Sequence, residues 1–102
     1  MKPRKYRTWD EVKTEHYTKH PKEIKSYLAI SLEEYQKDGD ERAFLSALAF
    51  AAKINGGFSK LSKKTGLNRE NLYRALSANR SDPRLSTIRR VLNALGFSLA
   101  IK

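Results

Sequence analysis

The sequence contains no cysteine, which excludes structural disulfides and thiolate metal sites and is compatible with a reducing compartment. No apolar run approaches the roughly 18 residues that a membrane-spanning helix needs. The basic N-terminus lacks the apolar stretch of a secretory signal peptide. We therefore expect a cytoplasmic protein, and the length of 102 residues favours a single domain.

Groupings of residues that would support catalysis are also missing. There is no Gly-rich phosphate loop and no Ser–His–Asp or Cys–His arrangement. His16 and His20 would share a helix face, but two ligands are too few for zinc. The run Asp38-Gly39-Asp40-Glu41 is far too short for a calcium loop and is typical of a helix-breaking turn followed by a cap. We expect a non-enzyme that holds no metal and no cofactor.

Acidic residues are scarce in the second half of the chain. Residues 1–40 contain nine Lys/Arg against eight Asp/Glu, whereas residues 41–102 contain twelve against three. The net charge of +10 is therefore concentrated in one half. A basic field of this kind attracts phosphate backbones and accelerates association. Charge alone also fits a basic solvated surface that serves solubility.

The first 20 residues are polar and mixed in charge, and we interpret residues 1–20 as an N-terminal arm. Thr8-Trp9-Asp10-Glu11 fits a capping box and predicts a short helix from Trp9. This segment is too polar to build a core by itself. Two interpretations remain open, an arm that packs on the domain and an arm that becomes ordered on a partner.

Residues 21–102 carry the helical periodicity of an all-α domain with five helices. The first is predicted to begin at Pro21 and to stop at Asp38-Gly39, and Asp40 caps the second, which ends at 55–57. Ser59 is the predicted N-cap of the third helix, Asn68 of the fourth and Ser86 of the fifth. The predicted inward positions are Ile24, Tyr27, Leu28, Ser31, Leu32, Tyr35, Phe44, Leu45, Leu48, Ala51, Ile54, Leu61, Leu67, Leu72, Ala75, Leu76, Ile88, Val91, Leu92 and Leu95.

The most informative stretch is residues 59–76, which predict two short helices joined by a tight turn at Gly66. A helix–turn–helix of this size places its second helix in the DNA major groove. Arginine there favours guanine and glutamate accepts from cytosine, while free amides at a helix N-terminus suit phosphate. The candidate DNA-binding residues are Ser59, Lys60, Asn68, Arg69, Glu70, Asn71, Tyr73, Arg74, Arg80 and Arg84.

Each candidate has an alternative interpretation. Arg69 and Arg74 would also fit a solvated helix face, and Arg80 and Arg84 would fit exposed loop charge. Tyr73 either stacks over sugar and phosphate or covers the edge of the core. RNA binding through the same face is disfavoured, because few aromatic side chains are placed for base stacking.

The pattern from Ser59 to Leu76, with Gly66-Leu67-Asn68-Arg69 at its centre, resembles the lambda-repressor-like (Xre-type) helix–turn–helix. The continuation from Pro83 to Gly96 resembles the closing helix of that family. More narrowly, residues 21–102 are similar to the addiction-module antidote proteins. The segments that carry this likeness are Tyr27-Leu28, Asp38-Gly39-Asp40, Phe44-Leu45-Ser46-Ala47-Leu48 and the run from Gly66 to Ser77.

This resemblance implies an antitoxin-like transcriptional regulator that binds double-stranded DNA at the promoter of its own operon and pairs with a RelE/ParE-like toxin. It also implies roles for the candidate residues. Base contact falls on Asn68, Arg69, Glu70 and Arg74, and phosphate contact on Ser59, Lys60, Asn71 and Arg84. The alternative is a protein-interaction module that mainly sequesters the toxin through Trp9, Tyr17 and the first two helices.

The end of the chain predicts a short β-strand, because Phe97, Leu99 and Ile101 alternate with less apolar residues. A lone strand needs a partner, so we predict that it pairs with its counterpart in a second copy and forms a homodimer. The competing interpretation is an extended tail on its own domain. Light scattering is expected to give the mass of a dimer, and a monomer at high micromolar concentration would contradict it.

Overall fold

The computed structural model describes residues 8–77 and 83–97, and helices are the only regular secondary structure in this part of the chain. A 3₁₀ turn at Pro21–Glu23 precedes the second helix. The helices are α1 (Trp9–Lys19), α2 (Ile24–Asp38), α3 (Glu41–Ile54), α4 (Gly57–Thr65), α5 (Arg69–Ala75) and α6 (Leu85–Ala94). Helices α2 to α6 are the five predicted for the domain, and α1 is the helix predicted from Trp9.

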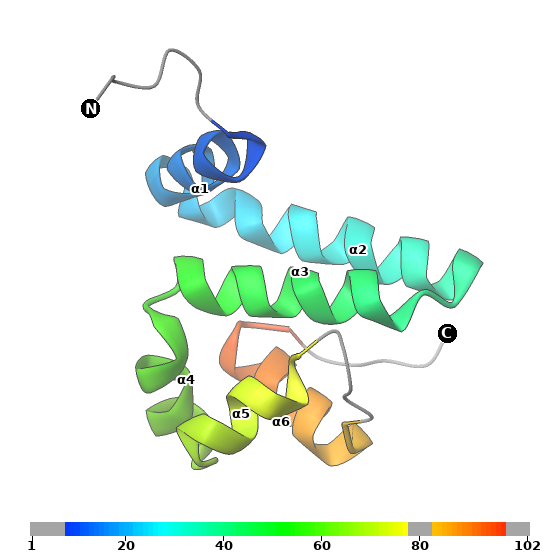
Figure 1. Ribbon diagram of the computed structural model, residues 1–102, viewed down its shortest axis with the longest axis vertical. Helices are drawn as coiled ribbons and strands as arrows, with labels where there is room; N and C mark the ends of the chain where they lie inside the picture. The colour runs from blue at the N-terminus through cyan, green and yellow to red at the C-terminus, as the bar shows by residue number, and fades with distance from the viewer. Residues whose placement is uncertain (1–7, 78–82, 98–102) are drawn as a thin grey trace.

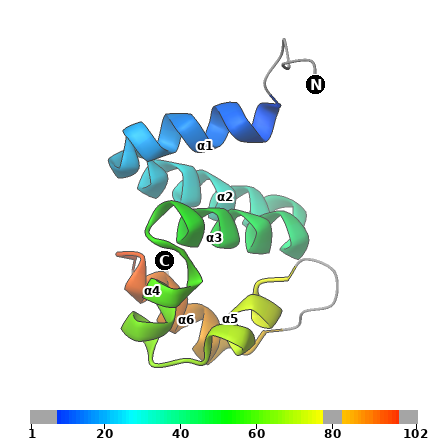
Figure 2. The ribbon, with the colours of Figure 1, turned by 60° about the vertical axis from the view of Figure 1, so that its left-hand side comes forward.

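The helices form layers around α3. Figures 1 and 2 show α2 lying along one side of α3 with α1 above α2, while α4, α5 and α6 lie on the other side of α3. Among the described residues, none of these helices is long and apolar enough to cross a bilayer.

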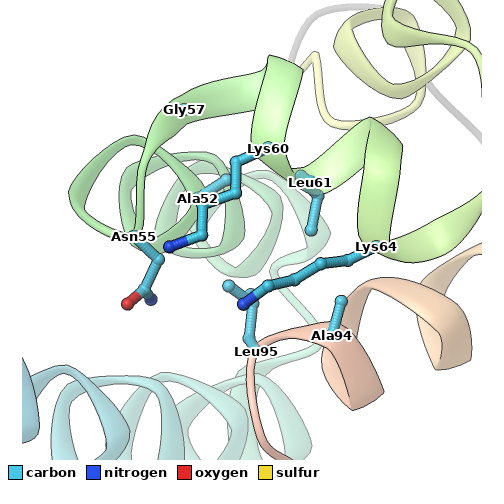
Figure 3. A pocket seen from close by; sticks show the side chains of 8 residues that line it. All are labelled: Ala52, Asn55, Gly57, Lys60, Leu61, Lys64, Ala94 and Leu95. Carbon is cyan, nitrogen blue, oxygen red and sulfur yellow. The ribbon is translucent and has the colours of Figure 1, made fainter.

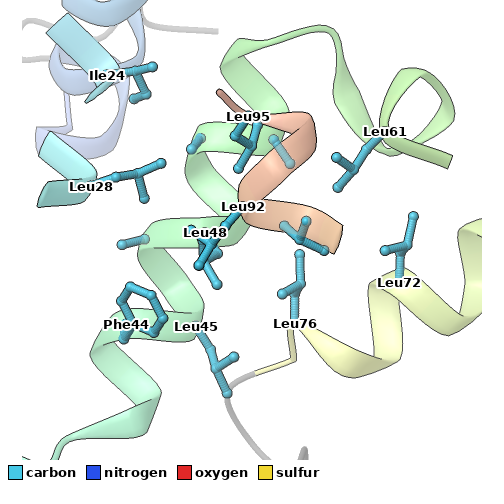
Figure 4. Packing of buried hydrophobic residues seen from close by; sticks show 14 residues of the cluster. Ile24, Leu28, Phe44, Leu45, Leu48, Leu61, Leu72, Leu76, Leu92 and Leu95 are labelled. Atoms are coloured by element: carbon cyan, nitrogen blue, oxygen red, sulfur yellow. The ribbon is translucent and has the colours of Figure 1, made fainter. Parts of the chain in front are cut away.

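The core is made of apolar side chains that converge on α3. The helix places Leu48 and Ala51 at the centre, both with 0% of their surface exposed. Figure 4 shows side chains from α2, α4, α5 and α6 meeting those of α3. Ala47, Ala51 and Ala52 are buried as well, and their small side chains allow the neighbouring helices to approach α3 closely. Every predicted inward position is buried or partly buried, which confirms the helical pattern read from the sequence.

Three of the predicted helix boundaries are confirmed in atomic detail. Thr8 Oγ1 accepts a hydrogen bond from the backbone N–H of Glu11 at 3.1 Å, so α1 begins as the capping box predicts. Gly39 ends α2 in the left-handed region, with φ of 69°. Asp40 then caps α3, because its Oδ1 accepts from the backbone N–H groups of Arg42 at 3.1 Å and Ala43 at 3.3 Å.

Two predicted caps are wrong. Helix α4 begins at Gly57, so Ser59 lies in its first turn rather than at its N-cap. The cap is Gly56 with φ of 107°, a conformation that restarts the helix directly after α3. Helix α6 likewise begins before Ser86, because the carbonyl of Arg84 already accepts from the N–H of Ile88 at 3.1 Å. The residue at this N-cap is therefore Arg84, whose side chain makes no capping bond.

Helix α1 packs on the domain through one aromatic cluster. The ring of Tyr17 lies 5.3 Å from that of Tyr27 on α2 and 5.7 Å from that of Phe50 on α3, measured between centroids. Lys13 Nζ lies 4.4 Å from the centroid of the Tyr27 ring and 4.2 Å from that of Phe50, and it donates to the Tyr27 hydroxyl. For residues 9–19 the structure thus favours the packed interpretation, while the boundary between residues 20 and 21 stays a prediction.

The C-terminal strand and the loop before α6 lie mostly outside the described residues. Phe97 is described, is partly buried and packs against the core. Leu99 and Ile101 fall in residues 98–102, and Arg80 falls in residues 78–82. The strand, the dimer and the lambda-repressor-like arrangement of the five helices stay predictions.

Leu48→Ala is expected to lower the free energy of unfolding by about 2–5 kcal/mol, because it removes a fully buried side chain at the centre of the core. Urea denaturation followed by circular dichroism measures the change. Ser46→Ala is the matched control on the same helix, since Ser46 is exposed and its loss leaves no cavity. Equal midpoints for the two variants would contradict the central place given to α3.

Candidate nucleic-acid interface

The turn between α4 and α5 is fixed by hydrogen bonds made by its own side chains. Gly66 has φ of 75°, and its N–H donates to the carbonyl of Ser62 at 2.9 Å. Thr65 Oγ1 accepts from the N–H of Leu67 at 3.1 Å, and the Ser62 hydroxyl donates to the carbonyl of Leu67. A side chain at Gly66 would find open space, so glycine is favoured there by its φ angle alone.

Helix α5 is held by its cap at one end and by its buried face along its length. Asn68 Oδ1 accepts from the backbone N–H groups of Glu70 at 2.7 Å and Asn71 at 3.3 Å, which confirms the predicted cap. Leu72 has 0% of its surface exposed, and Leu76, just after the helix, has 3%. Because this face is anchored in the core, the opposite face of α5 has a fixed direction.

The opposite face carries the polar residues predicted from the sequence. Arg69, Glu70, Asn71, Tyr73 and Arg74 are all exposed. Within the described residues, neither arginine is buried and neither forms an ion pair. A shallow hollow at the start of α5 is lined by Asn68, Arg69, Glu70 and Tyr73. The structure therefore brings five of the ten candidate residues onto one short helix, with Asn68 at its cap.

Tyr73 covers the edge of the core, as one of its two interpretations predicts, and its stacking over sugar and phosphate stays a prediction. Its ring centroid lies 5.6 Å from that of Phe58 on α4, so it covers the edge of a partly buried aromatic residue. The residue nevertheless keeps 68% of its surface exposed. The contact with Phe58 holds the tyrosine beside the outer face of α5 and leaves its surface accessible.

Three of the other candidates lie outside α5. Ser59 and Lys60 are exposed in the first half of α4, and Arg84 is exposed at the N-cap of α6. Figure 3 shows Lys60 and Lys64 extending from α4 over a small hollow bordered by the end of α3 and by Leu95. Lys60 and Lys64, one turn apart on α4, thus border the same hollow, and Lys64 is not among the ten predicted DNA-binding residues. Arg80 lies outside the described residues.

The described residues from α4 to the end of the domain carry almost only positive charge. Residues 57–77 and 83–97 contain eight lysines and arginines but a single acid, Glu70. Within the described part of the chain, none of the eight cations is ion-paired, whereas Lys19–Glu15 on α1 and Lys37–Glu33 on α2 are ion pairs. Three further cations that are not among the predicted DNA-binding residues are exposed as well, namely Lys63, Arg89 and Arg90. Helical periodicity identifies these exposed positions, because each one points in a different direction from a buried leucine or valine of its own helix.

Comparison with known proteins gave one match. Residues 8–102 match the sequence model of a family described as "Probable addiction module antidote protein". The match includes α1 and all five helices of the domain. Neither a search of curated proteins nor a search of solved structures found a match.

Asn68→Ala is expected to lower the free energy of unfolding by about 0.5–2 kcal/mol, because two backbone N–H groups of α5 lose their acceptor. Thermal and urea denaturation without DNA measure this change. Asn68→Ser is the control, since serine also caps helices and is expected to retain most of the stability. Equal stability of the alanine variant and the unmutated protein would show that the cap does not hold α5.

Proposed function

Because this chain belongs to the family of probable addiction module antidote proteins, we propose that it is the antitoxin of a type II toxin–antitoxin pair. We propose further that it is a transcriptional regulator that binds double-stranded DNA sequence-specifically and represses its own operon. In this proposal it is a cytoplasmic homodimer and not an enzyme, and its toxin is RelE/ParE-like.

The observation that carries the proposed DNA binding is the outer face of α5. Seven residues of helix span about 10 Å, which fits a major groove about 12 Å wide. The buried Leu72 and the hydrogen-bonded turn at Gly66 orient this face, and the unpaired cations around it supply the attraction to phosphate. A rigid helix that presents long donors in a basic field is the arrangement that base recognition needs.

The proposed contacts follow from the donors and acceptors that remain free. Arg69 and Arg74 offer paired donors to guanine, and Glu70 offers an acceptor to cytosine. The side-chain oxygen of Asn68 is engaged in the cap, so its amide nitrogen is the group left to donate to DNA.

Phosphate contacts complete the proposed interface. They are assigned to residues on and around the base-reading helix, where they position the protein and carry little sequence information. These residues are Ser59, Lys60, Asn71, Tyr73, Arg80 and Arg84.

Toxin sequestration is a second candidate function, and the family match favours it. Of the residues first assigned to it, Trp9 keeps 76% of its surface exposed on α1 and is available to a partner. Tyr17 is partly buried against Tyr27 and Phe50, so its ring is largely used in holding α1 to the domain. The two functions are compatible, because α1 and α2 lie on the other side of α3 from α5 (Figure 1).

Arg69→Ala is expected to weaken binding to the operator by about 1–3 kcal/mol and to relax specificity at one base pair. Lys60→Ala is expected to weaken binding similarly on all sequences and to reduce the dependence of log K on log salt by about one. Gel shifts on DNA from upstream of the protein's own gene, over a series of salt concentrations, measure both effects.

Lys37→Ala is the control for this comparison, because it also removes one positive charge but lies at the end of α2. Its affinity and its salt dependence are expected to stay close to those of the unmutated protein. Equal affinity of the unmutated protein for every duplex, unchanged by Arg69→Ala, would refute sequence-specific recognition by α5.

A further inference from the structure

The outer side of α2 and the start of α3 form a groove that no residue of α4, α5 or α6 lines. We call it the α2 groove and define it by Tyr27, Ile30, Glu34, Tyr35, Asp38 and Asp40. It lies on the side of α3 away from α5, as Figure 2 shows for the helices concerned. A molecule bound in it would leave the proposed DNA-binding face uncovered.

Part of the lining of this groove is apolar. Ile30 lines it and keeps 59% of its surface exposed. Tyr27 and Tyr35 lie on the same helix and are partly buried, so their rings are held in place beside it. The Tyr35 ring stacks on that of Phe44 at 5.5 Å between centroids. Tyr27, Ile30 and Tyr35 thus contribute the large apolar side chains of the groove lining.

The rim of the groove is negative, although the chain carries a net charge of +10. Glu34, Asp38 and Asp40 line it, and within the described residues none of the three is ion-paired. Asp38 and Asp40 each use Oδ1 to accept backbone N–H groups and keep the other oxygen free of such bonds. By contrast Glu33, which does not line the groove, lies 3.7 Å from Lys37.

The exposed Ile30 and the negative rim together favour one kind of occupant over others. Nucleic acid is repelled by the three carboxylates. A two-fold contact between the grooves of two copies would place like charges opposite each other. A cationic protein segment complements both the charge of the rim and the apolar surface of Ile30. Its Lys or Arg side chains reach the rim while an apolar side chain covers Ile30. Guanidinium groups also stack favourably on tyrosine rings.

We propose that the α2 groove is the docking site for a cationic segment of the partner toxin, in which an apolar side chain is flanked by Lys or Arg. This proposal rests on the toxin pairing given above and is independent of DNA binding. The groove thus defines a chemical property of the toxin surface that it binds.

The test measures the dissociation constant for the toxin encoded in the same addiction module, by titration calorimetry with the full chain. Glu34→Lys and Ile30→Asp are each expected to weaken binding at least about tenfold. Glu33→Lys is the matched control, because it makes the same charge change at the neighbouring position of α2 outside the groove. It is expected to stay within about twofold. All three residues are exposed, and thermal melts are expected to show that the variants remain folded.

A photo-crosslinking residue placed at Ile30 identifies the occupant directly. Mass spectrometry is expected to map the crosslink to a toxin segment that contains Lys or Arg. A crosslink to a second copy of this chain, or to an acidic toxin segment, would overturn the proposal.

The results separate the two proposals. If the unmutated protein binds the toxin and neither variant weakens it beyond the control, the groove assignment is wrong and the antitoxin function stands. If the unmutated protein does not bind the toxin, the toxin pairing is wrong and the groove assignment fails with it. Gel shifts on the same preparations are expected to show DNA binding by Glu34→Lys equal to that of Glu33→Lys.

Discussion

Burial of α3 is the constraint from which the positions of the other helices follow. Leu48 and Ala51 have no exposed surface, and side chains from α2, α4, α5 and α6 meet the same helix. Its buried alanines allow close approach on one side, and its larger residues fill the space between layers. Since α3 lies between α2 and the group α4 to α6, it divides the molecule into two faces of different chemistry (Figures 1 and 2).

The face built by α4 to α6 depends on a short, stiff connection. In the three-residue connection between α4 and α5, Ser62 and Thr65 bond to the backbone of Gly66 and Leu67, and Asn68 caps α5. The turn therefore has little freedom to change the angle between the helices. Because Leu72 anchors the inner side of α5, rotation of the helix about its axis is also restricted. The arginines of α5 are therefore long side chains on a helix that is held in one orientation. Phosphate attraction and recognition of nucleobases both require this arrangement.

The sequence predicted most of this framework, because helical spacing and capping residues are local signals. Asp40, Asn68 and Gly39 act as predicted, since each bonds or turns within three residues of its own position. Ser59 and Ser86 were wrong as caps because two glycines and an extended Arg84 let the helices begin earlier, and the serines then fall inside the first turn. Serine at a helix start is therefore a weaker signal than the backbone conformation that precedes it.

The sequence did not predict the α2 groove, and the reason is physical. Helical spacing leaves Ile30 out of the inward positions, but only the packing of α2 on α3 shows that this exposed residue lines a hollow. The same packing places Glu34, Asp38 and Asp40, which belong to a helix and a turn, around one hollow.

A sequence-wide charge count hides this negative site, because it adds those carboxylates to cations on the opposite side of α3. The separation has a consequence for regulation, since one ligand on each face could bind at the same time. If both proposals hold, coupling of toxin and DNA binding through the protein interior would involve α3 and its buried side chains, where close packing resists small displacements.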